Sequence, residues 1–208
     1  MIHYVLILAA GKSVRIKNSK TPKQFLELDN LPLLMHSALA FRKADPKSKI
    51  YIALPQDFSS DWDIMCSKYN FNINHKIYFG GASRFESVWV GLNEIYNDIK
   101  IQENKKSEHF DVNNVEKNYL ISVHDGARPF IDPEFIIGLI RSAKINYSAV
   151  PVIKLKNSLR KYKTEQKISS ESRERTNYML TQTPQVFLFS NLYNAYLRAS
   201  QLINESHD

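Results

Sequence analysis

The 208-residue chain contains a single cysteine, Cys66, and that scarcity limits what the protein can be. One thiol cannot form an intrachain disulfide framework, and it gives no basis for a metal site built from cysteine. We expect Cys66 to be a buried or half-buried structural thiol. The chain also has no stretch approaching the roughly 18 apolar residues of a membrane span, and its N-terminus lacks the pattern of a signal peptide. A cytoplasmic protein is therefore expected.

Glycine is scarce as well, with six residues, and neither common glycine-rich phosphate motif is present. The loop Ala9-Ala10-Gly11 fits neither G-x-x-x-x-G-K-[ST] nor G-x-G-x-x-G. Its small residues still let the backbone approach a bulky ligand, and the apolar run Tyr4–Leu8 before it is typical of a strand buried on both faces. Such a strand, followed by basic residues, is one way an α/β protein binds polyphosphate. An ordinary strand–helix turn with a solvated basic face fits equally well.

Basic residues outnumber acidic ones by 28 to 21, which gives a formal net charge of +7. This balance favours an anionic partner such as a nucleotide, a sugar phosphate, a nucleic acid or a membrane surface, without choosing among them. The polar stretch 97–118 mixes charges of both signs, so it predicts a solvated surface insertion rather than a nucleic-acid patch. We expect a small anionic ligand, with neither nucleic acid nor membrane as partner.

Apolar runs alternate with segments of helical spacing, which predicts one α/β domain over residues 1–208, a three-layer sandwich with a mostly parallel sheet. Ligands of such sheets bind beyond the carboxyl ends of the strands, so the loops after Leu8, Phe79 and Val123 are the candidate sites. The predicted strands are 4–8, 50–54, 76–79, 119–123 and 148–152, and the predicted helices are 33–42, 61–69, 83–96, 132–144 and 192–203.

Residues 154–178 interrupt this alternation. The segment is polar and has no sustained helical stripe, so it predicts a hairpin or arm projecting from the sheet; a long surface loop is the alternative. An exposed arm of this kind often pairs with a second subunit. Ser158 and Arg175 lie in it and Thr181–Gln185 follows it, which places hydroxyl groups beside an arginine as a weak second phosphate site.

Two stretches carry the cations and small residues that triphosphate chemistry needs. Arg15 and Lys23 supply fixed positive charge for non-bridging phosphate oxygens, and Pro22 restricts the backbone before Lys23; two ordinary surface cations are the alternative. The second stretch is Gly80–Arg84, where backbone amides at the start of a helix could hold an anion or contact the edge of a nucleotide base. Ser83 is better explained as a helix cap that forms a capping box with Glu86, and Ser87, one turn later, is expected to face the same pocket.

The third stretch, 124–129, follows a predicted strand directly. Asp125 at the carboxyl end of that strand suits Mg²⁺, which takes one or two carboxylates together with phosphate oxygens. Arg128 is able to bind a phosphate with two parallel hydrogen bonds. The alternative is a local ion pair between Asp125 and Arg128 that shapes the turn. We expect His124 to be a structural, hydrogen-bonding histidine.

Taken together, these stretches resemble the cytidylyltransferases that act on sugar-alcohol phosphates, typified by the 2-C-methyl-D-erythritol 4-phosphate cytidylyltransferase family. The matching stretches occur in the family's order and cover most of the chain. They are LAAGKSVR (8–15), PKQF (22–25), GGASRFESVWVGL (80–92), VHDGARPF (123–130) and TQTPQVF (181–187).

The resemblance implies a Rossmann-like α/β domain, of the nucleotide-diphospho-sugar transferase type, with a protruding β-arm that is exchanged in a homodimer. It also implies transfer of a cytidylyl group from CTP to a polyol phosphate with Mg²⁺, giving a CDP-alcohol and pyrophosphate for isoprenoid precursor synthesis. Positioning and charge stabilisation dominate such chemistry.

The resemblance further implies a role for each matching residue. Arg15 and Lys23 are the catalytic cations, and Asp125 is the metal-associated carboxylate. The polyol phosphate is held by Arg128 and by arm residues from the other subunit. The CTP pocket is lined by Ala9, Ala10, Gly11, Gly81, Ala82 and Ser87, and the polyol phosphate is bound by Arg128, Ser158, Arg175 and Thr183.

The sequence departs from the family's pattern in the arm and at its end. Asn157-Ser158-Leu159-Arg160 stands where the family usually reads Asp-Thr-Ile-Lys, and Glu174 stands where Asp is common. These changes leave the identity of the polyol open, with ribitol 5-phosphate as the alternative. The family continues with a strand, a helix and a lysine near the triphosphate, whereas this sequence ends at Asp208. We therefore expect weak or absent activity, and a nucleotide-binding protein without turnover is the other alternative.

Overall fold

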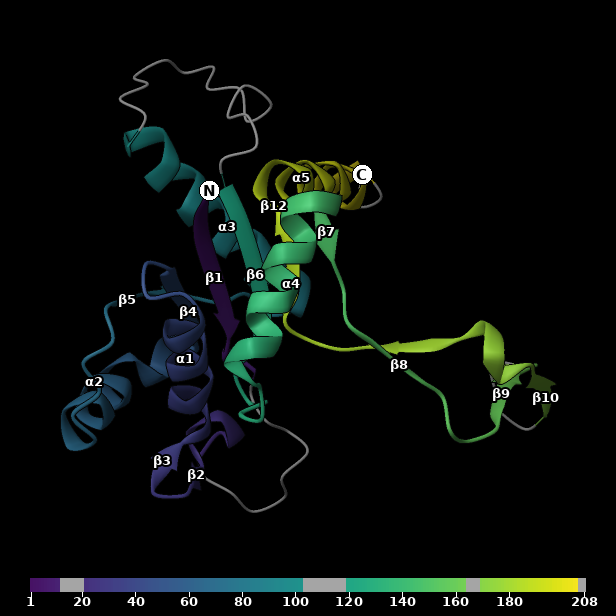
Figure 1. Cartoon of the computed structure of the whole chain (residues 1–208), viewed down its shortest axis with the longest axis horizontal. Helices are drawn as coiled ribbons and strands as arrows, with labels where there is room; N and C mark the ends of the chain where they lie inside the picture. The colour runs from purple at the N-terminus through teal and green to yellow at the C-terminus, as the bar shows by residue number, and fades with distance from the viewer. Residues whose placement is uncertain (12–20, 103–118, 164–168, 206–208) are drawn as a thin grey trace.

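A computed structural model of the chain describes residues 1–11, 21–102, 119–163 and 169–205. A six-stranded sheet forms its centre and helices cover both faces (Figure 1). The four strands from β5 to β6 are parallel, and β12 is antiparallel to both its neighbours. The predicted α/β fold with a mostly parallel sheet is confirmed. The strand order is β5 (His75–Phe79), β4 (Lys49–Leu54), β1 (Ile2–Leu8), β6 (Tyr119–Asp125), β12 (Gln185–Leu188) and β7 (Ser148–Ala149).

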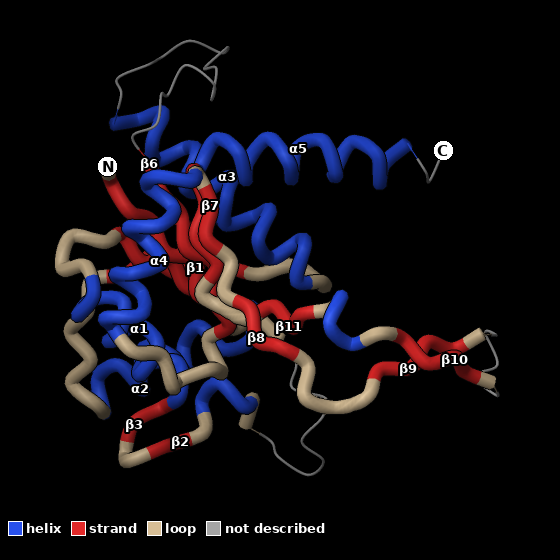
Figure 2. The backbone as a smooth tube through the Cα atoms, turned by 45° about the vertical axis from the view of Figure 1, so that its right-hand side comes forward, coloured by secondary structure: helices blue, strands red, loops and turns tan. Residues whose placement is uncertain are grey.

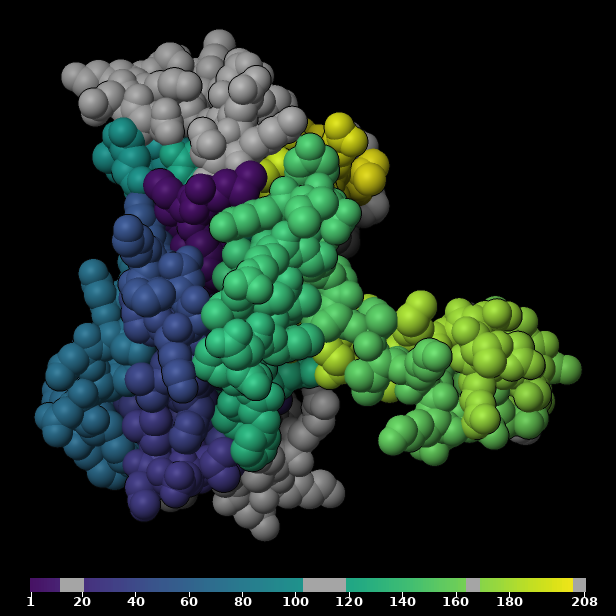
Figure 3. Space-filling model, in the orientation of Figure 1, coloured from purple at the N-terminus to yellow at the C-terminus, as the bar shows by residue number. Residues whose placement is uncertain are grey.

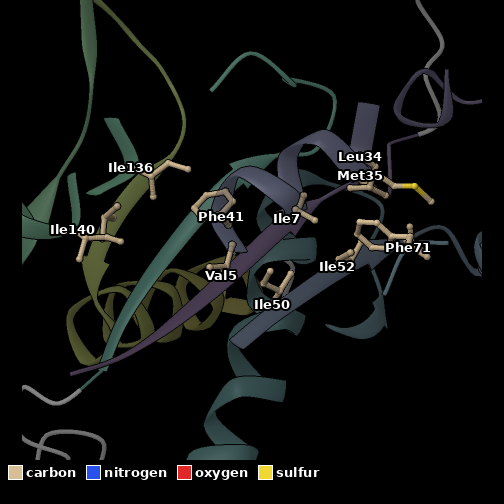
Figure 4. Close-up of a cluster of buried hydrophobic side chains, with 14 of the residues drawn as sticks. Val5, Ile7, Leu34, Met35, Phe41, Ile50, Ile52, Phe71, Ile136 and Ile140 are labelled. Carbon is tan, nitrogen blue, oxygen red and sulfur yellow. The ribbon is translucent and has the colours of Figure 1, made fainter. Parts of the chain in front are cut away.

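Two hydrophobic clusters, one on each face of the sheet, hold the helices in place. The first involves α1, α2 and α4, and the second involves α3 and α5; Figure 2 shows α1 and α4 across the sheet from α3. Val5 and Ile7 of β1 pack in the first cluster (Figure 4), whereas Tyr4 and Leu6 pack in the second. Since successive side chains of a strand point to opposite faces, burial on both faces requires a continuous apolar run. The helices are α1 (Leu33–Ala44), α2 (Ser59–Lys68), α3 (Arg84–Gln102), α4 (Pro133–Asn146) and α5 (Phe189–Glu205).

Two helical glycines give a matched test of this packing. A β-carbon at Gly91 in α3 would come within 2.6 Å of the Tyr78 hydroxyl and 2.7 Å of Leu6, whereas one at the exposed Gly138 in α4 would meet nothing within 4 Å. We expect Gly91→Ala to lower the free energy of unfolding by about 1–3 kcal/mol because it overpacks the core. Gly138→Ala should raise it by up to about 1 kcal/mol, because alanine favours helix. Urea unfolding measures both, and a stabilising Gly91→Ala would contradict the packing described.

The structure corrects two predicted boundaries. The strand expected over 148–152 is divided: β7 ends at Ala149 in the central sheet, and β8 (Val152–Lys154) begins the arm. Pro151 lies between them and has no N–H to donate to a ladder. Residues 97–102 of the insertion expected over 97–118 are helical instead, since α3 continues to Gln102 with Ile99 buried on the same face as Ile95. Residues 103–118 lie outside the described residues.

The arm projects from one side of the domain, as predicted (Figures 1 and 3). Two short antiparallel ladders build it: β8 pairs with β11 (Met179–Thr181), and β9 (Leu159–Tyr162) pairs with β10 (Ser170–Arg173). Its described residues include several exposed apolar side chains, and soluble proteins rarely expose such side chains together. They include Val152, Ile153, Tyr162, Tyr178, Met179 and Leu180.

The remaining elements are short. A 3₁₀ turn at Lys23–Phe25 precedes a small hairpin of β2 (Glu27–Leu28) and β3 (Leu31–Pro32), and further 3₁₀ turns lie at Gln56–Phe58 and Arg175–Asn177. Across the described parts of the chain, the helices are all too short or too polar to cross a membrane.

Candidate active site

A cleft of about 600 Å³ lies beyond the carboxyl ends of β1, β5 and β6, where the sequence placed the candidate loops. Its volume is within the range of small-molecule sites. Backbone hydrogen bonds continue past the strand ends and hold these loops side by side. Ala9 N–H donates to Ala53 O at 3.0 Å, Gly126 N–H to Leu8 O at 2.9 Å, and Gly80 N–H to Leu54 O at 3.1 Å. These bonds extend the hydrogen-bonding pattern of the sheet into the first residues of the loops.

Lys23 reaches the cleft from an anchored turn. Phe25, two residues after Lys23, is buried and packs against Phe58 and Trp62, with ring centroids 5.6 and 6.2 Å away. Between them Gln24 is 2% exposed, and its amide contacts the loop that precedes it. Lys23 is itself exposed and lines the cleft. Arg15, the other predicted catalytic cation, lies outside the described residues.

The loop before α3 also lines the cleft, through Gly81, Ala82 and Ser83. Ser83 caps the helix as expected, because Glu86 N–H donates to its hydroxyl at 3.1 Å. The Glu86 carboxylate accepts from Ala82 N–H at 2.7 Å, where an ordinary capping box would use the N–H of the cap residue itself. Ser87 lines the cleft but is 5% exposed, and its hydroxyl donates to Ser83 O at 2.9 Å.

Gly80 is required where the walls of the cleft meet. A β-carbon there would collide with the Ala10 side chain and lie 2.8 Å from the Ser87 hydroxyl. The loop before α3 therefore touches the loop after β1, and the small residues at both positions have a packing reason. This close approach places Ala10, Gly81 and Ser87 around the same end of the cleft.

Asp125 lies between two arginines. Its carboxylate is 3.1 Å from Arg128 Nε and 3.5 Å from Arg84 Nε, and Arg128 Nη1 donates to the Gln182 side chain at 2.9 Å. The local ion pair with Arg128 is thus present. All three charged side chains are 31–49% exposed, so water screens these pairs and they stabilise little. An anion in the cleft can therefore compete for the arginines at low energetic cost.

His124 fixes the hydroxyl of Thr183 at the edge of the site. His124 is fully buried, and burial lowers its pKa to about 4, so the ring is neutral at pH 7. Its Nε2 lies 3.1 Å from the carbonyl oxygen of Arg128, which only accepts, so Nε2 carries the proton. The Thr183 hydroxyl must then donate to Nδ1 at 3.0 Å, while it accepts from Asp125 N–H at 3.4 Å. The structural role expected of His124 is confirmed.

The structure brings together most of the predicted site residues but not all. Ser158 and Arg175 are exposed on the arm and do not line the cleft of their own chain, and Arg175 donates to Lys156 O at 2.7 Å. Among the polar side chains that line the cleft, Gln24 and Arg84 were given no role by the sequence. Both stood in the stretches PKQF and GGASR, but only a contact with a distant segment gives either one a role.

Asp125, the carboxylate that the sequence predicts for a metal, lines the cleft. Within the described ranges, no group of three or more histidine, cysteine, aspartate or glutamate side chains is placed to hold a metal ion. A partly exposed carboxylate that lines a cleft of small-molecule size fits Mg²⁺, because this ion takes most of its other ligands from water and substrate phosphates.

Fold and site together define a Rossmann-like α/β protein of the nucleotidyltransferase type. The family model described as 2-C-methyl-D-erythritol 4-phosphate cytidylyltransferase matches residues 3–102 and 103–208. The chain belongs to that family.

Curated relatives and solved structures agree with this assignment. The chain is 35% identical to the 2-C-methyl-D-erythritol 4-phosphate cytidylyltransferase of Azobacteroides pseudotrichonymphae over 193 residues, covering 93% of this chain and 76% of the relative. The enzyme of the same name from Bacteroides thetaiotaomicron is also 35% identical, over 92% of this chain and 77% of its own. The crystal structure of the Francisella tularensis enzyme superposes with a TM-score of 0.69 over 99% of this chain and 82% of that one; at 23% identity it supports the fold alone.

Proposed function

We propose that this protein transfers a cytidylyl group from CTP to 2-C-methyl-D-erythritol 4-phosphate, releasing pyrophosphate, as a cytoplasmic step in isoprenoid precursor synthesis. The observation that carries the proposal is the cleft in which Lys23, Asp125 and Arg128 meet, in a chain that belongs to this family. The curated relatives that cover most of the chain carry the name of this activity.

In the proposed reaction, a phosphate oxygen of the acceptor attacks the α-phosphorus of CTP. The new P–O bond forms as the bond from the α-phosphorus to the bridging oxygen breaks, and pyrophosphate leaves. Lys23, with Arg15, stabilises charge on the non-bridging oxygens, and Arg128 binds the acceptor phosphate in place of its present contact with Asp125. The loop residues Ala9, Ala10, Gly11, Gly81, Ala82 and Ser87 bind CTP.

Asp125 would hold Mg²⁺ together with oxygens of the CTP phosphates. The ion, when bound, neutralises charge on the triphosphate and on the leaving pyrophosphate. Before the substrates bind, Arg84 and Arg128 pair with the Asp125 carboxylate at the cleft. Thr183 keeps a lone pair available after its bonds to His124 and Asp125, so it accepts a hydrogen bond from a hydroxyl of the acceptor.

The activity is tested by pyrophosphate release from CTP and Mg²⁺, with methylerythritol phosphate and ribitol 5-phosphate assayed side by side. We expect more pyrophosphate release with methylerythritol phosphate than with ribitol phosphate, even where the overall rate is low. Release with ribitol phosphate alone would replace the proposed acceptor. If neither acceptor gave pyrophosphate release but calorimetry showed that CTP binds, the protein would be a nucleotide binder without turnover.

We also propose that the arm completes the site of a second subunit in a homodimer. Ser158 and Arg175 lie away from the cleft of their own chain, and the arm exposes apolar side chains such as Met179 and Leu180. A partner that buries this surface would bring the two polar residues to its own cleft, and a two-fold axis would make the exchange reciprocal.

This arrangement predicts complementation between two variants that are each nearly inactive when the acceptor is well below saturation. Lys23→Ala loses its cleft but keeps its arm, whereas Ser158→Ala/Arg175→Ala loses its arm residues but keeps its cleft. After unfolding and refolding of an equal mixture, we expect roughly a quarter of wild-type activity to return, because half the dimers are mixed and each has one intact site. Arms acting within their own subunit would restore none, and each variant refolded alone serves as the control.

A further inference from the structure

Gln24 is a buried amide for which the proposed reaction has no role so far. It is 2% exposed, and its Nε2 donates to Ala9 O at 2.5 Å and to Gly11 O at 3.3 Å. A side-chain amide nitrogen has two hydrogens, and both are used on the same three-residue loop. Turning the amide over would place Oε1 against two carbonyl oxygens, so the chemistry fixes its orientation.

The two acceptors belong to the loop that forms one wall of the cleft. A carbonyl oxygen is the negative end of a peptide dipole, and a triphosphate is repelled by such an oxygen when it is unpaired and turned toward it. The Gln24 amide both neutralises and orients the oxygens of Ala9 and Gly11.

The same residue fixes the turn that carries Lys23. Gln24 lies between Lys23, whose side chain lines the cleft, and Phe25, which is buried against Phe58 and Trp62. The 3₁₀ turn is thus tied at one side to the core and at the other to the nucleotide loop. A change at Gln24 therefore moves the loop and Lys23 relative to one another, although Gln24 need not touch the substrate.

We propose that Gln24 is a positioning residue that holds the Ala9–Gly11 loop in the shape that accepts the CTP triphosphate and sets Lys23 against it. The expected effect of Gln24 on the KM of CTP and on kcat rests on the proposed function. The structural half of the inference, that Gln24 orders the loop, stands on the two hydrogen bonds alone.

Two replacements of similar size separate this role from simple packing. Gln24→Met keeps the volume and removes both donors. Gln24→Glu keeps the shape but places an acceptor against two carbonyl oxygens. This repulsion destabilises the loop more than the loss of the donor alone. Ile50→Val serves as the matched control, because Ile50 is 2% exposed in the same hydrophobic cluster as Phe25 and distant from the loop in sequence.

The experiment compares the Michaelis constants for CTP and for methylerythritol phosphate, and kcat, in the wild type and these three variants. We expect Gln24→Met to raise the CTP constant about tenfold and to lower kcat, with the acceptor constant within about twofold of wild type, since losing a hydrogen bond to a positioned group costs on the order of 1.4 kcal/mol. Gln24→Glu should be worse, and Ile50→Val should leave all three values unchanged. Equal effects on both substrates, or a Gln24→Met variant that behaves like Ile50→Val, would overturn the proposal.

Two measurements keep this test separate from that of the proposed function. Hydrogen exchange of the backbone amides of residues 9–11, without substrate, should quicken in Gln24→Met and Gln24→Glu and not in Ile50→Val. Calorimetric titration with CTP and Mg²⁺ should show the same order of affinities without turnover. If the wild type released no pyrophosphate, these readouts would still decide the role of Gln24, and unchanged exchange in both Gln24 variants would reject it.

Discussion

Replacement of Lys23 by alanine is expected to lower kcat by about two to three orders of magnitude, the loss seen when one preorganised donor to a developing charge is removed. Lys23 lines the cleft from a turn fixed by buried neighbours, so its ammonium is placed before the substrates arrive. The negative charge that Lys23 stabilises on the phosphate oxygens is largest as the bond to pyrophosphate breaks. The variant should therefore lower kcat and kcat/KM alike.

Steady-state kinetics with each substrate varied in turn measures the effect. Lys68→Ala is the control, since Lys68 is an exposed lysine that pairs with Glu27 at 3.2 Å on the surface and is absent from the cleft lining. Arg175→Ala should instead raise the KM of methylerythritol phosphate and largely preserve kcat. A Lys23→Ala variant that changed only the KM of CTP, or that behaved like Arg175→Ala, would contradict this division of roles.

Acidification from pH 6.5 to 4 is expected to destabilise the fold through His124. Burial lowers the pKa of this imidazole to about 4, whereas in the unfolded chain it is near 6.5. Between these values the unfolded state binds a proton that the folded state does not, so stability rises with pH across the window and is lost as pH falls. At about 1.4 kcal/mol per pH unit, the loss from His124 approaches roughly 3 kcal/mol at the lower end.

Urea unfolding at half-unit steps of pH, in metal-free buffer, measures this loss. The His124→Asn variant should be less stable at pH 7, because Thr183 loses its acceptor, but its stability should vary less with pH from 6.5 to 4. The pKa of Asp45 is lowered chiefly by its hydrogen bond to His3. Asp45 therefore stabilises the fold at pH values above its pKa in the unfolded chain, and this stability is lost as the pH falls through its lower pKa in the folded protein. A variant with the same pH slope as the wild type would assign the acid sensitivity to other groups.

Local patterns in the sequence were sufficient for most of the secondary structure. The apolar run of β1 follows from burial on two faces, and α4 begins where Asp132 and Pro133 predict, with Glu134 N–H donating to the Asp132 carboxylate at 2.9 Å. Both depend on neighbours within a few residues, which a sequence displays directly. The strand β12 was missed because its four residues pair with β6 and β7, which precede it by more than thirty residues.

The sequence by itself determined the α/β class, the edge of the sheet at which the cleft lies, the presence of an arm and the family. Tertiary structure decided which groups share the cleft and which protons they hold. The Gln24 bonds to the nucleotide loop, the Arg84 pair with Asp125 and the donation from Thr183 to His124 join residues 15, 41 and 59 positions apart. No local periodicity encodes such contacts, because they arise only when packing of the sheet brings its loops to one edge.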